Sequence, residues 1–222
     1  MSKGIFVTGT GTDVGKTYVT ALLVKKLRES GYKAGYYKAA ISGASRIEES
    51  DAGYVKKISK IPQEEETLVS YLYQEAVSPH LAARWEGRPV EMEQVKKDFA
   101  KVKQQYEYVT VEGSGGILCP IRWDEKEKVM LEDVIQMLGL NLILVADAGL
   151  GSINASVLTT EYLRQKNRKV KGIILNHFTG TEMEEDNRKM IEELSGIPVI
   201  ATVKPGQEDL ETDGKTLASL YE

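Results

Sequence analysis

The segment VTGTGTDVGKTYVT, residues 7–20, restricts the fold more than any other part of the chain. A short apolar run leads into glycines and threonines, and a Lys-Thr pair then opens a helical pattern. Gly9 is followed by five residues and then by Gly15-Lys16-Thr17, one residue longer than the common phosphate motif. Glycine lets successive backbone N–H groups converge on phosphate oxygens, and a helix N-terminus adds partial positive charge. The segment therefore predicts a phosphate-binding loop between a strand and a helix.

Two side chains of this loop indicate a nucleoside triphosphate. Lys16 is expected to neutralise the terminal phosphates, and the Thr17 hydroxyl is expected to bind magnesium. The alternative is a glycine-rich turn that caps a helix, with Lys16 in solvent. The order strand, loop, Gly-Lys-Thr, helix favours the nucleotide site.

Apolar, β-prone runs alternate with helical patterns along the rest of the chain. Strands are predicted at residues 5–8, 34–39, 108–112, 142–146, 173–175 and 199–203. Helices are predicted at residues 16–29, 52–60, 92–105, 131–138, 153–165 and 183–194. Several of the strands are apolar almost throughout, which is typical of parallel strands covered on both faces. We expect an α/β, P-loop NTPase-like fold in a single domain, residues 1–222, with a mainly parallel sheet and helices on both faces.

Residues 64–88 are the least regular part of this pattern. Within them, Ser78-Pro79 is typical of a helix start, with serine as the N-cap and proline in the first helical position. Connections this long often reach over the carboxyl edge of a parallel sheet, where ligands bind.

Composition narrows the possible partners and location. The net charge is −4 and no basic stripe occurs, so we expect no nucleic-acid partner. No run is apolar enough to be a signal core or a membrane span, so we expect no membrane association. Cys119 is the only cysteine, which fits a reducing compartment. Together these features predict a cytoplasmic protein.

The segment YYKAAISG, residues 36–43, lies at the end of the second predicted strand. It brings Lys38 and Ser42 to the carboxyl edge of the sheet, beside the phosphate loop. A second lysine there could stabilise the charge that develops on a transferred phosphoryl group. A strand-end lysine in water is the alternative, and for a lone lysine it would be preferred.

Two acidic residues are candidate magnesium ligands. Asp51 precedes a predicted helix, so it is either an N-cap or a metal ligand, and the sequence does not separate these. Glu112 ends a buried strand and is followed by Gly113-Ser114-Gly115-Gly116. A β-turn explains these glycines but not the glutamate. Carboxylate oxygen suits magnesium, which takes one or two protein carboxylates and keeps most of its waters.

Taken in order, the motifs TGTGTDVGKT, YYKAAISG, SDA, SPH, VEGSGG, LGSINASVLT and ILNH resemble dethiobiotin synthetase. The resemblance implies a homodimer of single α/β domains that uses ATP and Mg²⁺. It also implies a reaction that joins 7,8-diaminononanoate with CO2 or bicarbonate and closes a ureido ring. In that reaction a carbamate of the substrate attacks the γ-phosphate, and the resulting carbamic-phosphoric anhydride is displaced by the second amine.

The resemblance also assigns site residues, taken position by position. Catalytic roles fall to Lys16 and Lys38, and magnesium to Thr17, Asp51 and Glu112. Contacts to ATP fall to Thr12, Asp13, Val14, Gly15, Lys16, Thr17, Tyr18, Glu112, Gly115 and Asn176. Contacts to the diamine, its carbamate or its tail carboxylate fall to Asp13, Ser42, Gly151, Ser152 and Asn154, the last three partly for a neighbouring subunit. Asn176 could equally be a turn residue, and Ser152 could simply cap a helix.

The chain departs from the family pattern at a few positions. Ala39 stands where proline is usual, which puts the rigidity of that backbone in question. Ser114 stands where alanine is commoner, and residues 204–206 match only loosely.

Two other functions compete with this interpretation. Amide-forming synthetases of the cobyrinate type share the scaffold but carry a glutaminase domain, for which 222 residues leave no room. A P-loop ATPase switch or partitioning protein would dimerise on ATP and bind DNA or a membrane. Such proteins often have an additional lysine early in the loop, whereas this loop opens Gly9-Thr10-Gly11.

Overall fold

A computed structural model describes residues 2–222, and its core is one seven-stranded sheet. The strand order is β3-β2-β4-β1-β7-β8-β9, and every pairing is parallel. These strands are β1 (Lys3–Gly9), β2 (Ala34–Ser42), β3 (Val69–Tyr73), β4 (Tyr108–Glu112), β7 (Leu142–Asp147), β8 (Val170–Asn176) and β9 (Val199–Val203). A separate antiparallel hairpin is formed by β5 (Pro120–Trp123) and β6 (Lys128–Met130).

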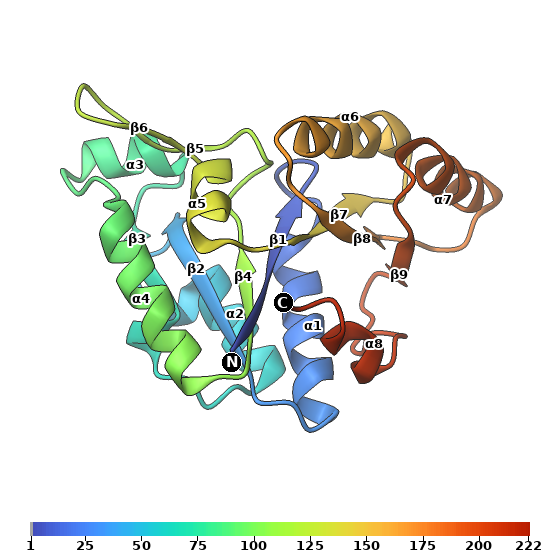
Figure 1. Ribbon diagram of the computed structural model, residues 1–222, viewed down its shortest axis with the longest axis horizontal. Coiled ribbons are helices and arrows are strands. Elements are labelled where there is room, and N and C mark those ends of the chain that lie inside the picture. Colours follow the sequence, from blue (N-terminus) through green and yellow to red (C-terminus); the bar gives the residue numbers. More distant parts are fainter. Residues whose placement is uncertain (1) are drawn as a thin grey trace.

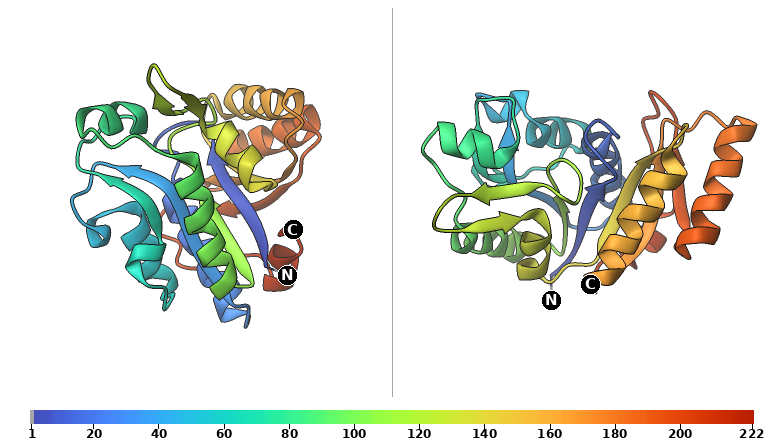
Figure 2. Two further views of the ribbon diagram at one scale, coloured as in Figure 1. Left: turned by 60° about the vertical axis from the view of Figure 1, so that its left-hand side comes forward. Right: turned by 90° about the horizontal axis from the view of Figure 1, so that it is seen from above.

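Helices cover both faces of the sheet (Figures 1 and 2). The helices are α1 (Lys16–Glu29), α2 (Asp51–Ser59), α3 (Pro79–Trp85), α4 (Met92–Gln105), α5 (Leu131–Leu138), α6 (Ser152–Gln165), α7 (Glu182–Ser195) and α8 (Gly214–Ala218). One apolar core packs α1, α2 and α8 against one face of the sheet. Two others pack α3, α4, α5, α6 and α7 against the opposite face. The predicted α/β fold with a parallel sheet is confirmed.

The strand order explains where a ligand can bind. β1 lies between β4 and β7, so the chain builds the sheet outward in both directions from its first strand. In open parallel sheets, the crevice at such a reversal of strand order is the usual ligand site. The loop after β1 is the predicted phosphate loop, and the ends of β2 and β4 meet it at the same edge (Figure 1).

The structure contains elements that the sequence pattern did not predict. β3 falls within the segment 64–88 that we considered irregular; it is an edge strand, and four of its five residues are only partly buried. Such a partly exposed edge strand lacks the continuous apolar run from which the other strands of the sheet were predicted. The hairpin β5–β6 and the five-residue α8 are too short to show a period. Helix α3 does begin at Pro79, although the Ser78 side chain makes no capping hydrogen bond.

Within residues 2–222, no helix combines the length and the apolar character that crossing a bilayer requires.

Candidate active site

The phosphate loop occupies the turn between β1 and α1. Gly15 has a φ of +84°, a conformation that side chains rarely adopt, and Asp13 also has a positive φ, +61°. A Cβ atom on Gly15 would lie 2.0 Å from Nδ2 of Asn176, so no larger residue fits there. The Nζ atom of Lys16 donates a hydrogen bond to the Gly11 carbonyl oxygen at 2.7 Å. The ammonium group is therefore held over the loop that is predicted to bind phosphate.

A cavity of about 1150 Å³ opens over the carboxyl ends of β1, β2 and β4. It contains most of the residues that the sequence assigned to ATP, magnesium and the diamine: Thr12, Asp13, Gly15, Lys16, Thr17, Tyr18, Lys38, Ser42, Asp51, Glu112 and Gly115. Residues 76–79, before and at the start of α3, and residues 118–120, before and at the start of β5, also line it. The irregular connection that we expected to reach over the sheet edge does so.

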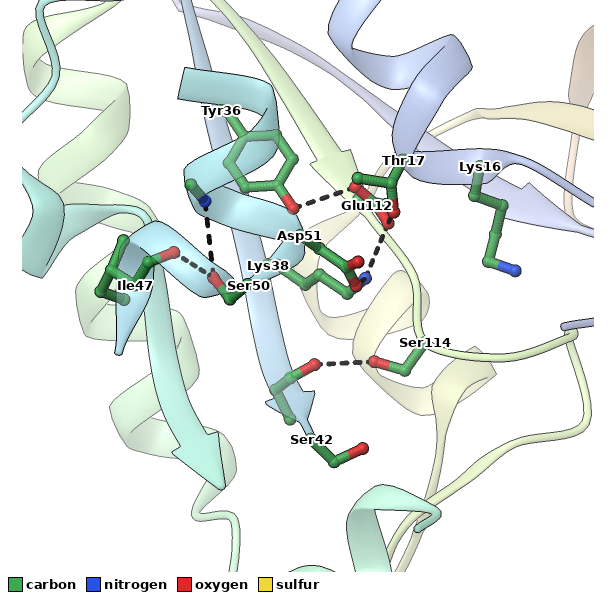
Figure 3. A network of polar contacts seen from close by, with 12 residues as sticks. Lys16, Thr17, Tyr36, Lys38, Ser42, Ile47, Ser50, Asp51, Glu112 and Ser114 are labelled. Carbon is green, nitrogen blue, oxygen red and sulfur yellow. Dashed lines mark hydrogen bonds and ion pairs between the residues drawn. The ribbon is translucent and has the colours of Figure 1, made fainter. Parts of the chain in front are cut away.

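A buried cluster of charges lies on the floor of this cavity. Lys38 and Glu112 are register partners on the neighbouring strands β2 and β4. Lys38 Nζ lies 2.7 Å from Glu112 Oε1 and 2.6 Å from Asp51 Oδ2, and Glu112 Oε1 also accepts a 2.7 Å hydrogen bond from the Thr17 hydroxyl (Figure 3). Lys38 is only 3% exposed and Glu112 only 1%. The interpretation of Lys38 as a lysine in water is therefore wrong.

Asp51 does not cap α2. The N-cap is Ser50, whose hydroxyl accepts a hydrogen bond from the Gly53 backbone N–H. Asp51 is the first helical residue, and its carboxylate turns to Lys38. Burial alone would raise the pKa of Asp51, but the charge and hydrogen bond of Lys38 outweigh burial and lower this pKa below its usual value. Of the two interpretations that the sequence left open, the simple cap is excluded.

The two lysines of the cavity have opposite electrostatic environments. Burial lowers the pKa of Lys16, and the nearby charge of Lys38 lowers it further. Burial also disfavours the charged form of Lys38, but Glu112 and Asp51 outweigh it and raise the pKa of Lys38. Lys38 thus has two carboxylate partners, whereas Lys16 contacts a neutral carbonyl. An anion in the cavity would therefore stabilise the charged form of Lys16 more than that of Lys38, which already has two negative partners.

Two serine hydroxyls form hydrogen bonds between segments at the rim of the cavity. The Ser42 hydroxyl, at the end of β2, donates to the Val77 carbonyl oxygen at 2.6 Å. The Ser114 hydroxyl donates to the Ala40 carbonyl oxygen at 2.7 Å (Figure 3). The serine that departs from the family pattern therefore fastens the glycine-rich loop after β4 to β2, one residue beyond Ala39.

Five predicted contact residues lie outside the cavity wall: Val14, Asn176, Gly151, Ser152 and Asn154. Asn176 is the last residue of β8 and is 1% exposed; its Nδ2 donates to the Val14 carbonyl oxygen at 3.0 Å, beneath the phosphate loop. It is therefore not a turn residue. The last three, Gly151, Ser152 and Asn154, lie at the start of α6, where Gly151 is the N-cap and Ser152 makes no cap. The Ser152 hydroxyl oxygen is buried without a hydrogen-bond partner, so simple capping by Ser152 is wrong.

Sequence reasoning missed Tyr36. Its hydroxyl donates to Glu112 Oε2 at 3.0 Å. A signal existed, because residues two apart in a strand share a face, and Tyr36 lies two residues before Lys38.

Comparison with known proteins identifies the family. A family model described as an AAA domain matches residues 3–212. The ATP-dependent dethiobiotin synthetase BioD of Brachyspira hyodysenteriae is 48% identical over the full length of both chains. The enzyme of that name from Clostridium botulinum (strain 657 / Type Ba4) is also 48% identical, over 100% of this chain and 99% of its own. The chain belongs to the dethiobiotin synthetase family. The resemblance predicted from its motifs is confirmed.

Solved structures show a fold that is shared more widely than this family. The MinC:MinD cell division complex of Aquifex aeolicus matches with a TM-score of 0.58 at 15% identity, over 91% of this chain and 81% of that one. The septum site-determining protein MinD from Pyrococcus horikoshii, complexed with Mg-ADP, matches with a TM-score of 0.55 at 16% identity, over 92% and 82%. At such identities the match supports the P-loop NTPase-like fold alone.

Proposed function

We propose that this chain is an ATP-dependent dethiobiotin synthetase, which closes the ureido ring of dethiobiotin from 7,8-diaminononanoate and CO2. The observation that carries this proposal is the cluster of Lys16, Lys38, Thr17 and two carboxylates beside a phosphate loop, in a chain 48% identical to such enzymes over its full length. We infer that residues 1–222 act as one domain. The lone buried Cys119 supports a cytoplasmic location.

The nucleotide would lie along the phosphate loop. Its phosphates would contact residues 12–18, with Glu112 beside Thr17 and with Gly115 also in the cavity wall. Lys16 and Lys38 would stabilise the charge that develops as the γ-phosphoryl group is transferred. We propose that Asn176 contacts the adenine, which requires its side chain to leave the Val14 carbonyl oxygen.

The oxygen atoms around Lys38 fit a magnesium ion. Thr17, Asp51 and Glu112 would hold it, because a hydroxyl and two carboxylates converge on one position and all offer the oxygen ligands that Mg²⁺ prefers. When bound, magnesium would neutralise phosphate charge and orient the γ-phosphate for in-line transfer. Lys38 now provides the positive charge between these carboxylates. It cannot share their oxygens with a metal ion, so we expect Lys38 to turn toward the γ-phosphate.

The reaction needs no nucleophile from the protein. One substrate amine adds to CO2 and loses a proton, which gives a carbamate. A carbamate oxygen then attacks the γ-phosphorus and ADP leaves; the second amine attacks the carbonyl carbon, closes the ring and expels phosphate. Asp13 and Ser42, which both line the cavity, would position the amines and the carbamate. Gly151, Ser152 and Asn154 would receive the tail carboxylate.

We also propose a homodimer formed through α6. Leu150, before α6, is 93% exposed, and Leu158 on the helix is 62% exposed. They lie four residues to either side of Asn154, a spacing that puts Asn154 and Leu158 on one helix face. Exposed leucines around a proposed substrate contact support an interface that brings one subunit's α6 to its partner's site.

The decisive experiment measures ADP release from purified protein with ATP, magnesium and bicarbonate, with and without 7,8-diaminononanoate. We expect release to depend on the diamine and to match dethiobiotin formed, measured by mass spectrometry. ADP release that ignores the diamine would instead favour the switch or partitioning ATPase.

A further inference from the structure

The two oxygens of Glu112 have separate sets of partners. Oε1 accepts hydrogen bonds from Thr17 Oγ1 and Lys38 Nζ, both at 2.7 Å, and both donors line the cavity. Oε2 accepts a bond from the Tyr36 hydroxyl at 3.0 Å, and Tyr36 does not line the cavity. Figure 3 shows the Tyr36 ring pointing at the carboxylate from the side away from Lys16. One oxygen thus faces exchangeable partners, and the other faces the protein interior.

The position of Tyr36 is fixed by its backbone as well as by its ring. β2 pairs with β3 only from Lys38 onward, so the strand lacks a β3 partner at Tyr36. The Gln63 side chain fills this place: its Oε1 accepts from the Tyr36 N–H at 2.9 Å, and its Nε2 donates to the Tyr36 carbonyl oxygen at 2.8 Å. Gln63 is 1% exposed and Tyr36 is fully buried. The hydroxyl therefore has little freedom to leave Glu112.

The contact to Oε2 differs from the two contacts to Oε1. The neutral Tyr36 hydroxyl donates to Oε2 from a fully buried residue that does not line the cavity. Lys38 and Thr17 differ, because a cation entering the cavity can replace them at Oε1.

We propose that Tyr36 is a positioning residue for the metal-binding carboxylate. Its hydroxyl occupies Oε2 and fixes the rotation of the Glu112 carboxyl group, so that Oε1 alone is presented to the cation. This inference rests on the proposed role of Glu112 as a magnesium ligand. Partners that orient a metal ligand are commonly worth about tenfold to a hundredfold in metal affinity.

The neighbouring tyrosine provides a matched control. Tyr37 is also fully buried in β2, but on the opposite face, where its hydroxyl contacts Ser70 Oγ at 2.6 Å and the Val95 carbonyl oxygen at 3.1 Å. Tyr36→Phe and Tyr37→Phe each remove one buried hydroxyl from one strand. Only the first removes a contact to Glu112.

The test is a titration of Mn²⁺ binding to the full-length protein in the presence of a saturating non-hydrolysable ATP analogue. The EPR signal of free Mn²⁺ measures how much of the ion is unbound. We expect Tyr36→Phe to raise the Mn²⁺ dissociation constant about tenfold. Tyr37→Phe should leave that constant unchanged. Melting curves without metal check that both variants fold, and both should melt below the wild type. A wild-type constant for Tyr36→Phe, or an equal rise for Tyr37→Phe, would overturn the proposal.

Glu112→Gln in the same titration separates this proposal from the proposed function. If Glu112→Gln weakens Mn²⁺ binding and Tyr36→Phe does not, the positioning role alone fails. If Glu112→Gln binds Mn²⁺ as the wild type does, the assignment of Glu112 as a metal ligand fails, and the role of Tyr36 fails with it.

Discussion

Lys16 and Lys38 share one cavity but have different partners, and this difference separates their expected roles. Lys38 is held between two carboxylates, whereas among residues 2–222 Lys16 donates only to the Gly11 carbonyl oxygen. Breaking a buried ion pair leaves an uncompensated charge, so replacing Lys38 should damage both stability and function. Replacing Lys16 tests function more cleanly.

For Lys16→Ala we expect turnover to fall by roughly a thousandfold or more, because a cation at the transferred phosphoryl group is lost. The fold should persist, since no carboxylate loses its partner. Steady-state ADP release and a thermal melt measure the two effects. Activity near that of the wild type would contradict the assigned role, and loss of the cooperative melt would show that Lys16 is structural.

At this scale the sequence predicted two polar residues of apolar strands. Glu112 ends β4 and Lys38 lies within β2, and both were identifiable because a charged residue departs from the apolar pattern of a buried parallel strand. Tyr36 was missed although it shares a strand face with Lys38, and Gln63 was missed because a single buried glutamine has no pattern of its own. The hydrogen bonds that fix them join residues 27 and 76 positions apart. Such contacts depend on the register between strands, which the sequence pattern did not provide.

Among the elements, α7 begins with a complete capping box. Thr181 and Glu184 form a capping box, and Glu184 Oε2 accepts from the backbone N–H groups of Thr179, Gly180 and Thr181. These bonds, led by that from Thr181, lower the pKa of Glu184 from 4.5 to about 2. A carboxylate with a lowered pKa stabilises the fold fully above its ordinary pKa, and this contribution is lost as pH falls toward the lowered value.

Glu184→Gln should therefore lower the melting temperature by a few degrees at pH 7. The gap from the wild type should narrow as pH falls from 4.5 toward 2, the range over which wild-type Glu184 takes up its proton. Melting curves across this range measure the effect. Glu182→Gln, on the exposed side of the same first turn, is the control and should change little. A gap that stays constant with pH would contradict the role of the Glu184 charge.

For the molecule as a whole, the alternation of apolar runs and helical patterns was enough to predict the architecture. Six of the seven strands of the sheet were predicted, and the missing one is the partly exposed edge strand β3. The strand order was not predictable in the same way. It depends on the crossover from β1 to β2, which leaves a place in the sheet between them that β4 later fills. That order brings Glu112 beside Lys38.

The proposed homodimer gives a prediction at the same scale. Leu158→Glu places a charge on an α6 surface that we propose to be buried between subunits, so the variant should be monomeric where the wild type is dimeric. Leu194 on α7 is 51% exposed, and Leu194→Glu serves as the control that should remain a dimer. Light scattering after size-exclusion chromatography measures both masses. A dimer for Leu158→Glu would exclude this surface.

The last residues of the sequence hold its first strand. Gly4 in β1 exchanges backbone hydrogen bonds with Glu222, and the fully buried ring of Tyr221 reaches the Thr110 hydroxyl on β4. During synthesis, some two hundred residues must therefore follow the phosphate loop before β1, the strand that precedes this loop, can form its hydrogen bonds to Glu222. Nascent chains stalled before residue 217 should remain open to proteases near their N-terminus, and release of residues 217–222 should close that region.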